Sequence, residues 1–152
     1  MTQMTMNKTM SVAAIRNGTV IDHITHGQAL AVLQLLNLTQ SNKKITLGLN
    51  LPSLTQQFKD IIKVEDWELT PNEADRLAIL SPLATINIIH EYEVAKKFKV
   101  SLPETISNIF KCPNPRCISN HEAIASQFFV KSHSQKIQLQ CRFCRKSFYQ
   151  AL

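Results

Sequence analysis

The side chains best suited to chemistry in this 152-residue chain are four cysteines near its C-terminal end. They form two close pairs, Cys112 with Cys117 and Cys141 with Cys144, and the first 111 residues contain no cysteine. Two such pairs from distant segments can converge on one ion, and Zn²⁺ binds four thiolates in a tetrahedron with Zn–S bonds of about 2.3 Å. We therefore predict that these four residues hold one structural Zn²⁺ per chain.

Paired cysteines have other uses, and two of them compete with zinc. Disulfides belong to oxidising compartments, and the polar start of the sequence has no apolar core of a secretory signal. A redox pair of the thioredoxin type lies at the start of a helix, whereas Cys141 ends the strand-like run 136–141. A catalytic zinc site usually includes a histidine. His121 and His133 lie outside the paired spacing, so we expect both at the surface.

The location of the chain is expected to be cytoplasmic, without contact with a membrane. No apolar run reaches the ~18 residues that a membrane-spanning helix needs. No Ser-His-Asp order, HExxH motif or phosphate-binding Gly-rich loop is present, so we expect that the chain is not an enzyme.

The net charge of +6 falls entirely in residues 111–152, whereas residues 1–110 balance their charges. Charge and cysteine content therefore change together near residue 110, which indicates two domains with different tasks. A basic four-cysteine module with Phe143, Phe148 and Tyr149 could also contact phosphates and stack bases. A nucleic-acid-binding zinc-ribbon adaptor is therefore the alternative hypothesis.

The first hundred residues have the pattern of a sheet covered by helices. We expect strands at 10–15, 45–51, 60–67, 84–89 and 91–98. In the second of these, every other residue from Ile45 to Leu51 is apolar, which predicts one buried face. Thr25 with Gln28, and Thr70 with Glu73, have the spacing of capping boxes at helix starts. The order βαββαβ, followed by one more strand, predicts a ferredoxin-like α+β domain with both helices on one face of the sheet.

The run Ser101-Leu102-Pro103 interrupts this pattern, and we place the domain boundary there, with domains at 1–102 and 103–152. Three strand-like runs follow, at 126–132, 136–141 and 147–150. A segment of this size buries too little surface to be stable alone. We therefore expect a small all-β domain that depends on its metal for stability.

Several motifs, taken in order, carry a family resemblance. They are GTVIDHI (18–24), ITLGLNLPS (45–53), KDIIKVE (59–65), ATIN (84–87), YEV (92–94), SLPE (101–104) and CPN followed by CIS (112–119). With the cysteine spacing, they resemble the regulatory chain of aspartate carbamoyltransferase over essentially the whole length. The resemblance implies a non-catalytic subunit of pyrimidine biosynthesis that forms homodimers and docks on the catalytic chain through its zinc domain. It also implies inhibition by CTP with UTP, activation by ATP, and no nucleic-acid partner.

The resemblance further implies a nucleotide site in the first domain. The matching positions are Val12, Ala14, Ile15, Tyr92 and Val94 for the base, Asp22 and Lys63 for the ribose, Lys63, Asn87 and Lys97 for the phosphates, His23 beside the triphosphate, and Lys59 near a second nucleotide. By themselves these positions could equally be solvated charges or ordinary sheet residues. Only the family pattern distinguishes them.

Overall fold

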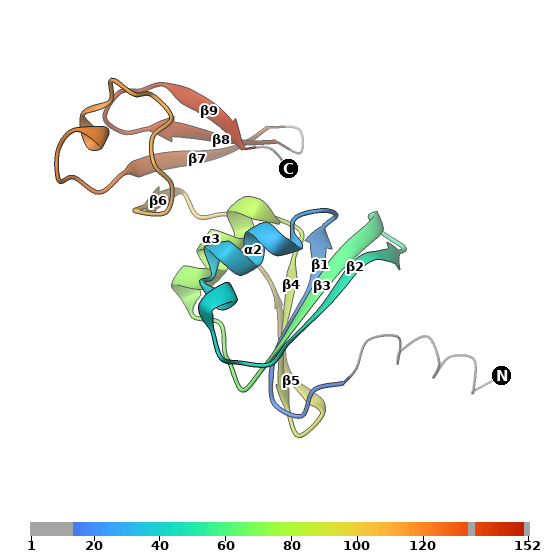
Figure 1. Cartoon of the computed structure of the whole chain (residues 1–152). Coiled ribbons are helices and arrows are strands. Elements are labelled where there is room, and N and C mark those ends of the chain that lie inside the picture. Colours follow the sequence, from blue (N-terminus) through green and yellow to red (C-terminus); the bar gives the residue numbers. More distant parts are fainter. Residues whose placement is uncertain (1–13, 134–135, 151–152) are drawn as a thin grey trace.

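The computed structural model describes residues 14–133 and 136–150, which form two sheets and two α-helices (Figure 1). The first domain contains β1 (Gly18–Thr25), α2 (Ala29–Leu35), β2 (Ile45–Ser53), β3 (Gln57–Glu65), α3 (Pro71–Leu80), β4 (Thr85–His90) and β5 (Glu93–Lys99). Its strands are all antiparallel and lie in the order β2-β3-β1-β4-β5. Both helices cover one face of this sheet (Figure 1), so the predicted α+β class is confirmed.

The alternation of side chains along the strands decides which face the helices cover. Ile62 and Val64 of β3, and Ile86 and Ile88 of β4, are buried in one apolar cluster with residues of α2 and α3. Successive side chains of a strand point to opposite faces. The residues between them, Lys63 and Asn87, therefore lie on the face away from the helices.

The start of α3 follows the sequence prediction. Thr70 is the N-cap, and its hydroxyl accepts a hydrogen bond from the backbone N–H of Glu73 at 3.3 Å. The Glu73 carboxylate accepts the backbone N–H of Thr70 at 3.2 Å, which completes the capping box. Pro71 occupies the first helical position, where no intrahelical N–H bond is lost.

The capping box predicted at Thr25 and Gln28 is wrong. Gln28 is the N-cap of α2, and its side chain makes no capping hydrogen bond. The carboxylate of Asp60, in the neighbouring strand β3, instead accepts the N–H groups of Gly27 at 3.1 Å and Ala29 at 3.3 Å. A carboxylate at a helix N-terminus satisfies free N–H groups and interacts favourably with the helix dipole. The cap is therefore supplied by a residue far away in the sequence.

Two strand predictions need correction. Of the strand predicted at 10–15, positions 10–13 lie outside the described residues, and Ala14 and Ile15 are not in a strand; the first described strand is β1. In β2, Leu47 and Leu49 are 37% and 49% exposed instead of buried. Leu47 is in regular register but lies in β2, at the edge of the sheet. Leu49 falls within the register shift between Gly48 and Leu51, so the alternation predicted for 45–51 does not bury it.

The second domain is a four-stranded antiparallel sheet with the order β6-β7-β8-β9. Its strands are β6 (Thr105–Ser107), β7 (Gln127–His133), β8 (Lys136–Cys141) and β9 (Ser147–Gln150). The last three were predicted, whereas the short β6 was not. Ile79, near the end of α3, is buried in the apolar cluster of this second domain, and Leu102 packs against both clusters. The two domains therefore touch through the end of α3.

Candidate functional site

The four cysteines converge at one end of the second sheet. The Sγ atoms of Cys112 and Cys144 are 3.8 Å apart, those of Cys117 and Cys141 are 3.6 Å apart, and all four lie within 4.8 Å of one another. A tetrahedron with Zn–S bonds of about 2.3 Å has edges of about 3.8 Å. A disulfide would need about 2.05 Å, so this spacing fits four ligands of one ion. All four cysteines are free thiols.

Two loops hold the thiols in place. In the first loop, the side-chain amide of Asn120 donates to the carbonyls of Cys112 at 2.9 Å and Asn114 at 2.8 Å. In the second loop, the N–H of Arg145 donates to the Cys141 carbonyl at 3.0 Å. Arg145 has a φ of 66°, the left-handed conformation that ends this tight turn. Asn120 has no signature that would have revealed its role in the sequence.

The protein environment does not favour four thiolates equally. The Ser119 hydroxyl, 3.1 Å from the sulfur, lowers the pKa of Cys117 to about 6. Burial raises the pKa of Cys112 to about 12 and also raises the pKa of Cys141. Four close thiolates repel one another, so a cation at their centre is needed to keep all four charged.

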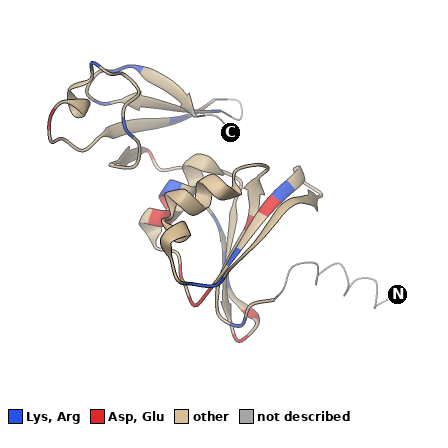
Figure 2. Cartoon of the chain, in the orientation of Figure 1, with Lys and Arg blue, Asp and Glu red and all other residues tan. Residues whose placement is uncertain are grey.

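Histidine does not take part in this centre. The ring Nε2 of His121 lies 2.7 Å from the carbonyl oxygen of Pro115, and both His121 and His133 are exposed, as predicted. Among the described residues, the four cysteines are the only group spaced to hold a metal ion. The surrounding domain carries many more basic than acidic residues (Figure 2), which leaves it basic overall.

A second candidate site lies on the helix-free face of the first sheet. Lys63 of β3 pairs with Val20 of β1, Val20 with Asn87 of β4, and Asn87 with Lys97 of β5. Residues directly opposite in neighbouring strands share a face, with Cβ atoms about 5 Å apart. Two lysines and an amide therefore form one row across four strands, which is a surface suited to an anion.

Asp22 and His23 lie to one side of this row, further along β1 in a bulge of that strand. The register between β1 and β3 shifts after Ile21, and His23 has a φ of 55°. The Asp22 carboxylate accepts the His23 N–H at 2.6 Å and lies 2.9 Å from the Lys59 ammonium. Burial lowers the pKa of Lys63, and the charge of Asp22 partly opposes this shift. The structure therefore brings Lys59 and Lys63 close to the Asp22 carboxylate.

The residues predicted to contact a base lie on the opposite side of the row from Asp22. Val94 pairs with the buried Ile89, two residues from Asn87 along β4, so the face becomes apolar in this direction. Tyr92 is exposed at the turn between β4 and β5, and its N–H donates to the Arg16 carbonyl at 2.9 Å. Of the remaining positions, Ile15 is buried, Ala14 is exposed, and Val12 lies outside the described residues.

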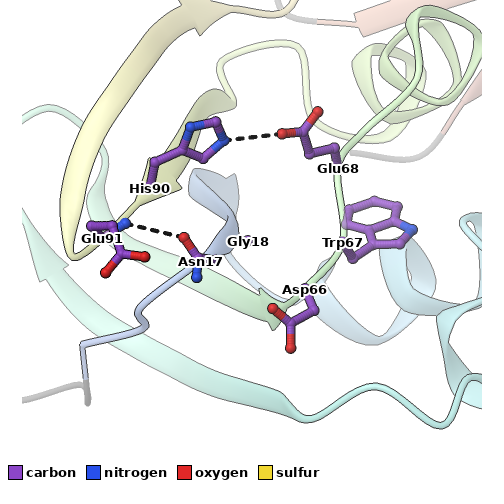
Figure 3. Close-up of a pocket in the computed structure, with 7 residues that line it drawn as sticks. All are labelled: Asn17, Gly18, Asp66, Trp67, Glu68, His90 and Glu91. Carbon is purple, nitrogen blue, oxygen red and sulfur yellow. Dashed lines mark hydrogen bonds and ion pairs between the residues drawn. The ribbon is translucent and has the colours of Figure 1, made fainter.

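A hollow of about 490 Å³ lies near this turn but differs in character (Figure 3). It is lined by Asn17, Gly18, Asp66, Trp67, Glu68, His90 and Glu91. Its His90 ring lies 3.2 Å from the Glu68 carboxylate. Three carboxylates repel a polyphosphate, so the hollow does not compete with the row of lysines for that ligand.

Fold and site together define a class of protein: a two-domain chain in which an α+β domain presents two lysines and an amide in one row on its sheet face, and a small all-β domain presents a four-thiol metal centre. Comparison with known proteins specifies the family. The family model described as aspartate carbamoyltransferase regulatory chain, allosteric domain, matches residues 10–101. The model described as the metal binding domain of the same chain matches residues 104–151.

Curated relatives agree over nearly the full length. A regulatory chain of aspartate carbamoyltransferase from Sodalis glossinidius (strain morsitans) is 48% identical over 145 residues, which cover 95% of this chain and 94% of the relative. The chain of the same name from Chromobacterium violaceum is 43% identical over 143 residues, 94% of each. The chain therefore belongs to the aspartate carbamoyltransferase regulatory chain family.

Family membership confirms two of the sequence predictions. The resemblance drawn from the ordered motifs is correct, and the expectation of a chain that is not an enzyme is confirmed because the family is that of a regulatory chain. The part of the chain that the structure describes contains no helix long and apolar enough to cross a membrane.

Proposed function

We propose that this chain senses nucleotides for a catalytic partner, the catalytic chain of aspartate carbamoyltransferase, in pyrimidine biosynthesis in the cytoplasm. CTP, together with UTP, inhibits the partner, and ATP activates it from the same site. The mechanism is linkage: a nucleotide shifts the partner's activity only if it binds the two states of the assembly with different affinities, and such couplings are typically about 1–3 kcal/mol.

The observation that carries this proposal is the row formed by Lys63, Val20, Asn87 and Lys97. Lys97 and Asn87 hold phosphate oxygens, and Lys63 bridges the phosphates and the ribose. No Gly-rich phosphate loop is present in the sequence, so side-chain cations supply most of the attraction.

The groups around the row complete the proposed nucleotide site. Asp22 accepts a ribose hydroxyl, and His23 lies beside the triphosphate. The base lies on the apolar side of the row, against Ile15, Tyr92 and Val94. Lys59, which contacts Asp22 at 2.9 Å, serves a second nucleotide.

The second domain, which we place at residues 103–152, docks on the catalytic chain and holds one Zn²⁺ through its four cysteines. The 3.6 and 3.8 Å spacing of its thiols supports a tetrahedral ion of this size. Zinc in such a closed set of four ligands does no chemistry itself. It supplies folding free energy and fixes the shape of the docking surface.

The first domain, at residues 1–102, pairs with a second copy of itself. Strand β2 lies at the edge of its sheet, and Leu47, Leu49 and Phe58 expose apolar surface there. An unprotected apolar edge strand is a template for pairing with another chain. This edge therefore supports a regulatory-chain homodimer that links catalytic trimers.

The test is calorimetric titration of the chain with CTP and ATP, before and after Lys97→Ala. We expect the substitution to weaken both nucleotides about tenfold, since it removes one charge-assisted contact. Lys96→Ala is the matched control, because Lys96 lies on the opposite face, 5.2 Å above the Phe98 ring. Equal binding by wild type and Lys97→Ala would contradict the assigned site. Salt-sensitive binding of single-stranded DNA with no response to nucleotides would favour the zinc-ribbon adaptor instead.

A further inference from the structure

A group of hydrogen bonds ties the segment before β1 to the turn between β4 and β5. We propose that Arg16, Asn17 and Glu91 form a frame that fixes the distance between the two walls of the base site. They thereby act as positioning residues for nucleotide recognition. This inference rests on the proposed function, because the two walls are the residues assigned to the base: Ile15 on one side, and Tyr92 with Val94 on the other.

The contacts of the frame use both backbone and side chains. The Arg16 guanidinium donates to both carboxylate oxygens of Glu91, through Nε at 2.9 Å and through a terminal nitrogen at 3.2 Å. The Asn17 side-chain oxygen accepts the backbone N–H of Glu91 at 3.1 Å, as Figure 3 shows. The Arg16 carbonyl accepts the N–H of Tyr92 at 2.9 Å. Both N–H groups of the turn are therefore bound to the two residues that follow Ile15.

The backbone of the turn explains why such support is needed. Glu91 and Tyr92 have φ values of 49° and 67°, and both are therefore in the left-handed region. Two-residue hairpin turns of this kind favour Asn and Gly, which adopt positive φ at little cost. Two larger side chains in this conformation persist only where surrounding contacts hold them. The bonds from Arg16 and Asn17 are those contacts.

The frame is also anchored on its other side. The Asn17 carbonyl accepts the N–H of Asp66, directly after β3, at 3.0 Å. Asn17 therefore links the ends of β3 and β4 as well as the start of β1. The phosphate-binding row crosses the middle of the sheet at Lys63 and Asn87, several residues away from this end. Loosening the frame should therefore disturb the base and leave the phosphates in place.

The experiment compares two probes, CTP and inorganic triphosphate, by calorimetry on the full chain. If the loosened walls hold the binding arrangement about a fifth of the time, the apparent affinity for CTP falls about fivefold. We expect this loss in Arg16→Ala, in Glu91→Ala and in Asn17→Ala, with the affinity for inorganic triphosphate unchanged. Arg16→Ala combined with Glu91→Ala should lose no more than the larger single loss, because both remove the same ion pair.

Two controls keep the inference testable. Lys44→Ala breaks another ion pair of this domain, Lys44–Glu65 at 3.4 Å, and should leave the affinity for both probes unchanged. Exchanging the charges, Arg16→Glu with Glu91→Arg, should restore most of the CTP affinity. Unchanged CTP binding in all three single variants, or an equal loss for CTP and triphosphate, would overturn the frame. A wild-type chain that binds neither CTP nor ATP would instead overturn the proposed function, and the frame with it.

Discussion

The two domains of this chain are stabilised in different ways. Among its described residues, the first buries sixteen apolar residues in one cluster formed by its sheet, its two helices and the adjoining loops. The cluster of the second has eight members, of which three are cysteines and one, Ile79, comes from α3 of the first domain. Apart from cysteine, the buried apolar residues in the described part of its own sheet are Ile106, Phe128, Ile137 and Leu139. The first domain can therefore fold by burial of apolar surface, whereas the second needs an additional source of free energy.

Because of this contrast, the two domains should lose stability through different changes. A metal that binds only the folded state contributes its binding free energy to folding. The second domain should therefore respond to chelators and to cysteine substitution, and the first should respond to changes of backbone and packing. The following predictions test this division, from the largest expected effect to the smallest.

Removal of the metal should have the largest effect. Cys112→Ser, or treatment with a strong chelator, is expected to unfold residues 103–152 and leave the first domain folded, because the lost binding free energy is about 10 kcal/mol or more. Amide resonances of β6–β9 should collapse in NMR spectra while those of β1–β5 persist, and metal content should fall to zero. Ser107→Ala, at an exposed position of β6, is the control. A second domain that keeps its dispersed resonances without metal would contradict the division.

Gly18→Ala should destabilise the first domain and leave the second domain folded. Gly18 has a φ of 142°, and a Cβ there would lie 2.1 Å from the Val64 carbonyl oxygen, which belongs to the partner strand. We expect a loss of roughly 4 kcal/mol in the free energy of unfolding of the first domain, measured with urea. Gly27→Ala is the matched control, because its φ is 85° and its Cβ would meet no atom within 4 Å. That variant should lose only about 1 kcal/mol. Comparable losses in the two variants would contradict the steric argument.

Asp60→Asn tests a contact that joins three segments of the first domain. Asp60 is almost fully buried, and its carboxylate accepts the N–H groups of Gly27, Ala29 and Asn50, the last at 3.0 Å. An amide turns one acceptor oxygen into a donor that faces N–H groups, which should cost about 2–3 kcal/mol. Asp66→Asn, at an exposed position, should be neutral within ~0.5 kcal/mol. If both variants unfold at the same urea concentration, Asp60 is not the cap of α2.

Asp60 also illustrates what the sequence could predict and what it could not. Three local signals were reliable: the Thr70–Glu73 box lies within one turn, and strands 136–141 and 147–150 follow from their own composition. The cap of α2 depends on a residue some thirty positions away, so no local pattern could reveal it.

The same limit explains the other errors. The exposure of Leu47 and Leu49 depends on a register shift against β3 and on the position of β2 in the sheet. Strand β6 has three residues and is defined by its pairing with β7. The cysteine centre was predictable because the chemistry of four thiols restricts the possibilities more than any packing pattern does. Residue spacing alone could not predict the lysine row, since strand order brings its members together; only the family resemblance pointed to Lys63, Asn87 and Lys97.

The smallest predicted effect concerns Lys63 and pH. Burial lowers the pKa of Lys63 from its ordinary value of 10.5, with the charge of Asp22 acting in the opposite direction. The unfolded chain therefore binds more protons than the folded chain just below pH 10.5, so this group's contribution to stability rises as pH increases through that window. A polyphosphate beside the ammonium favours its charged form and raises the pKa again.

Nucleotide binding near about pH 9.5 should therefore take up a fraction of a proton, and binding at about pH 7 should take up none at this residue. Calorimetry in two buffers of different ionisation enthalpy measures the uptake. Lys63→Arg keeps the charge at all these pH values, so it should abolish the uptake while retaining much of the affinity. Proton uptake that persists in Lys63→Arg would assign it to another group.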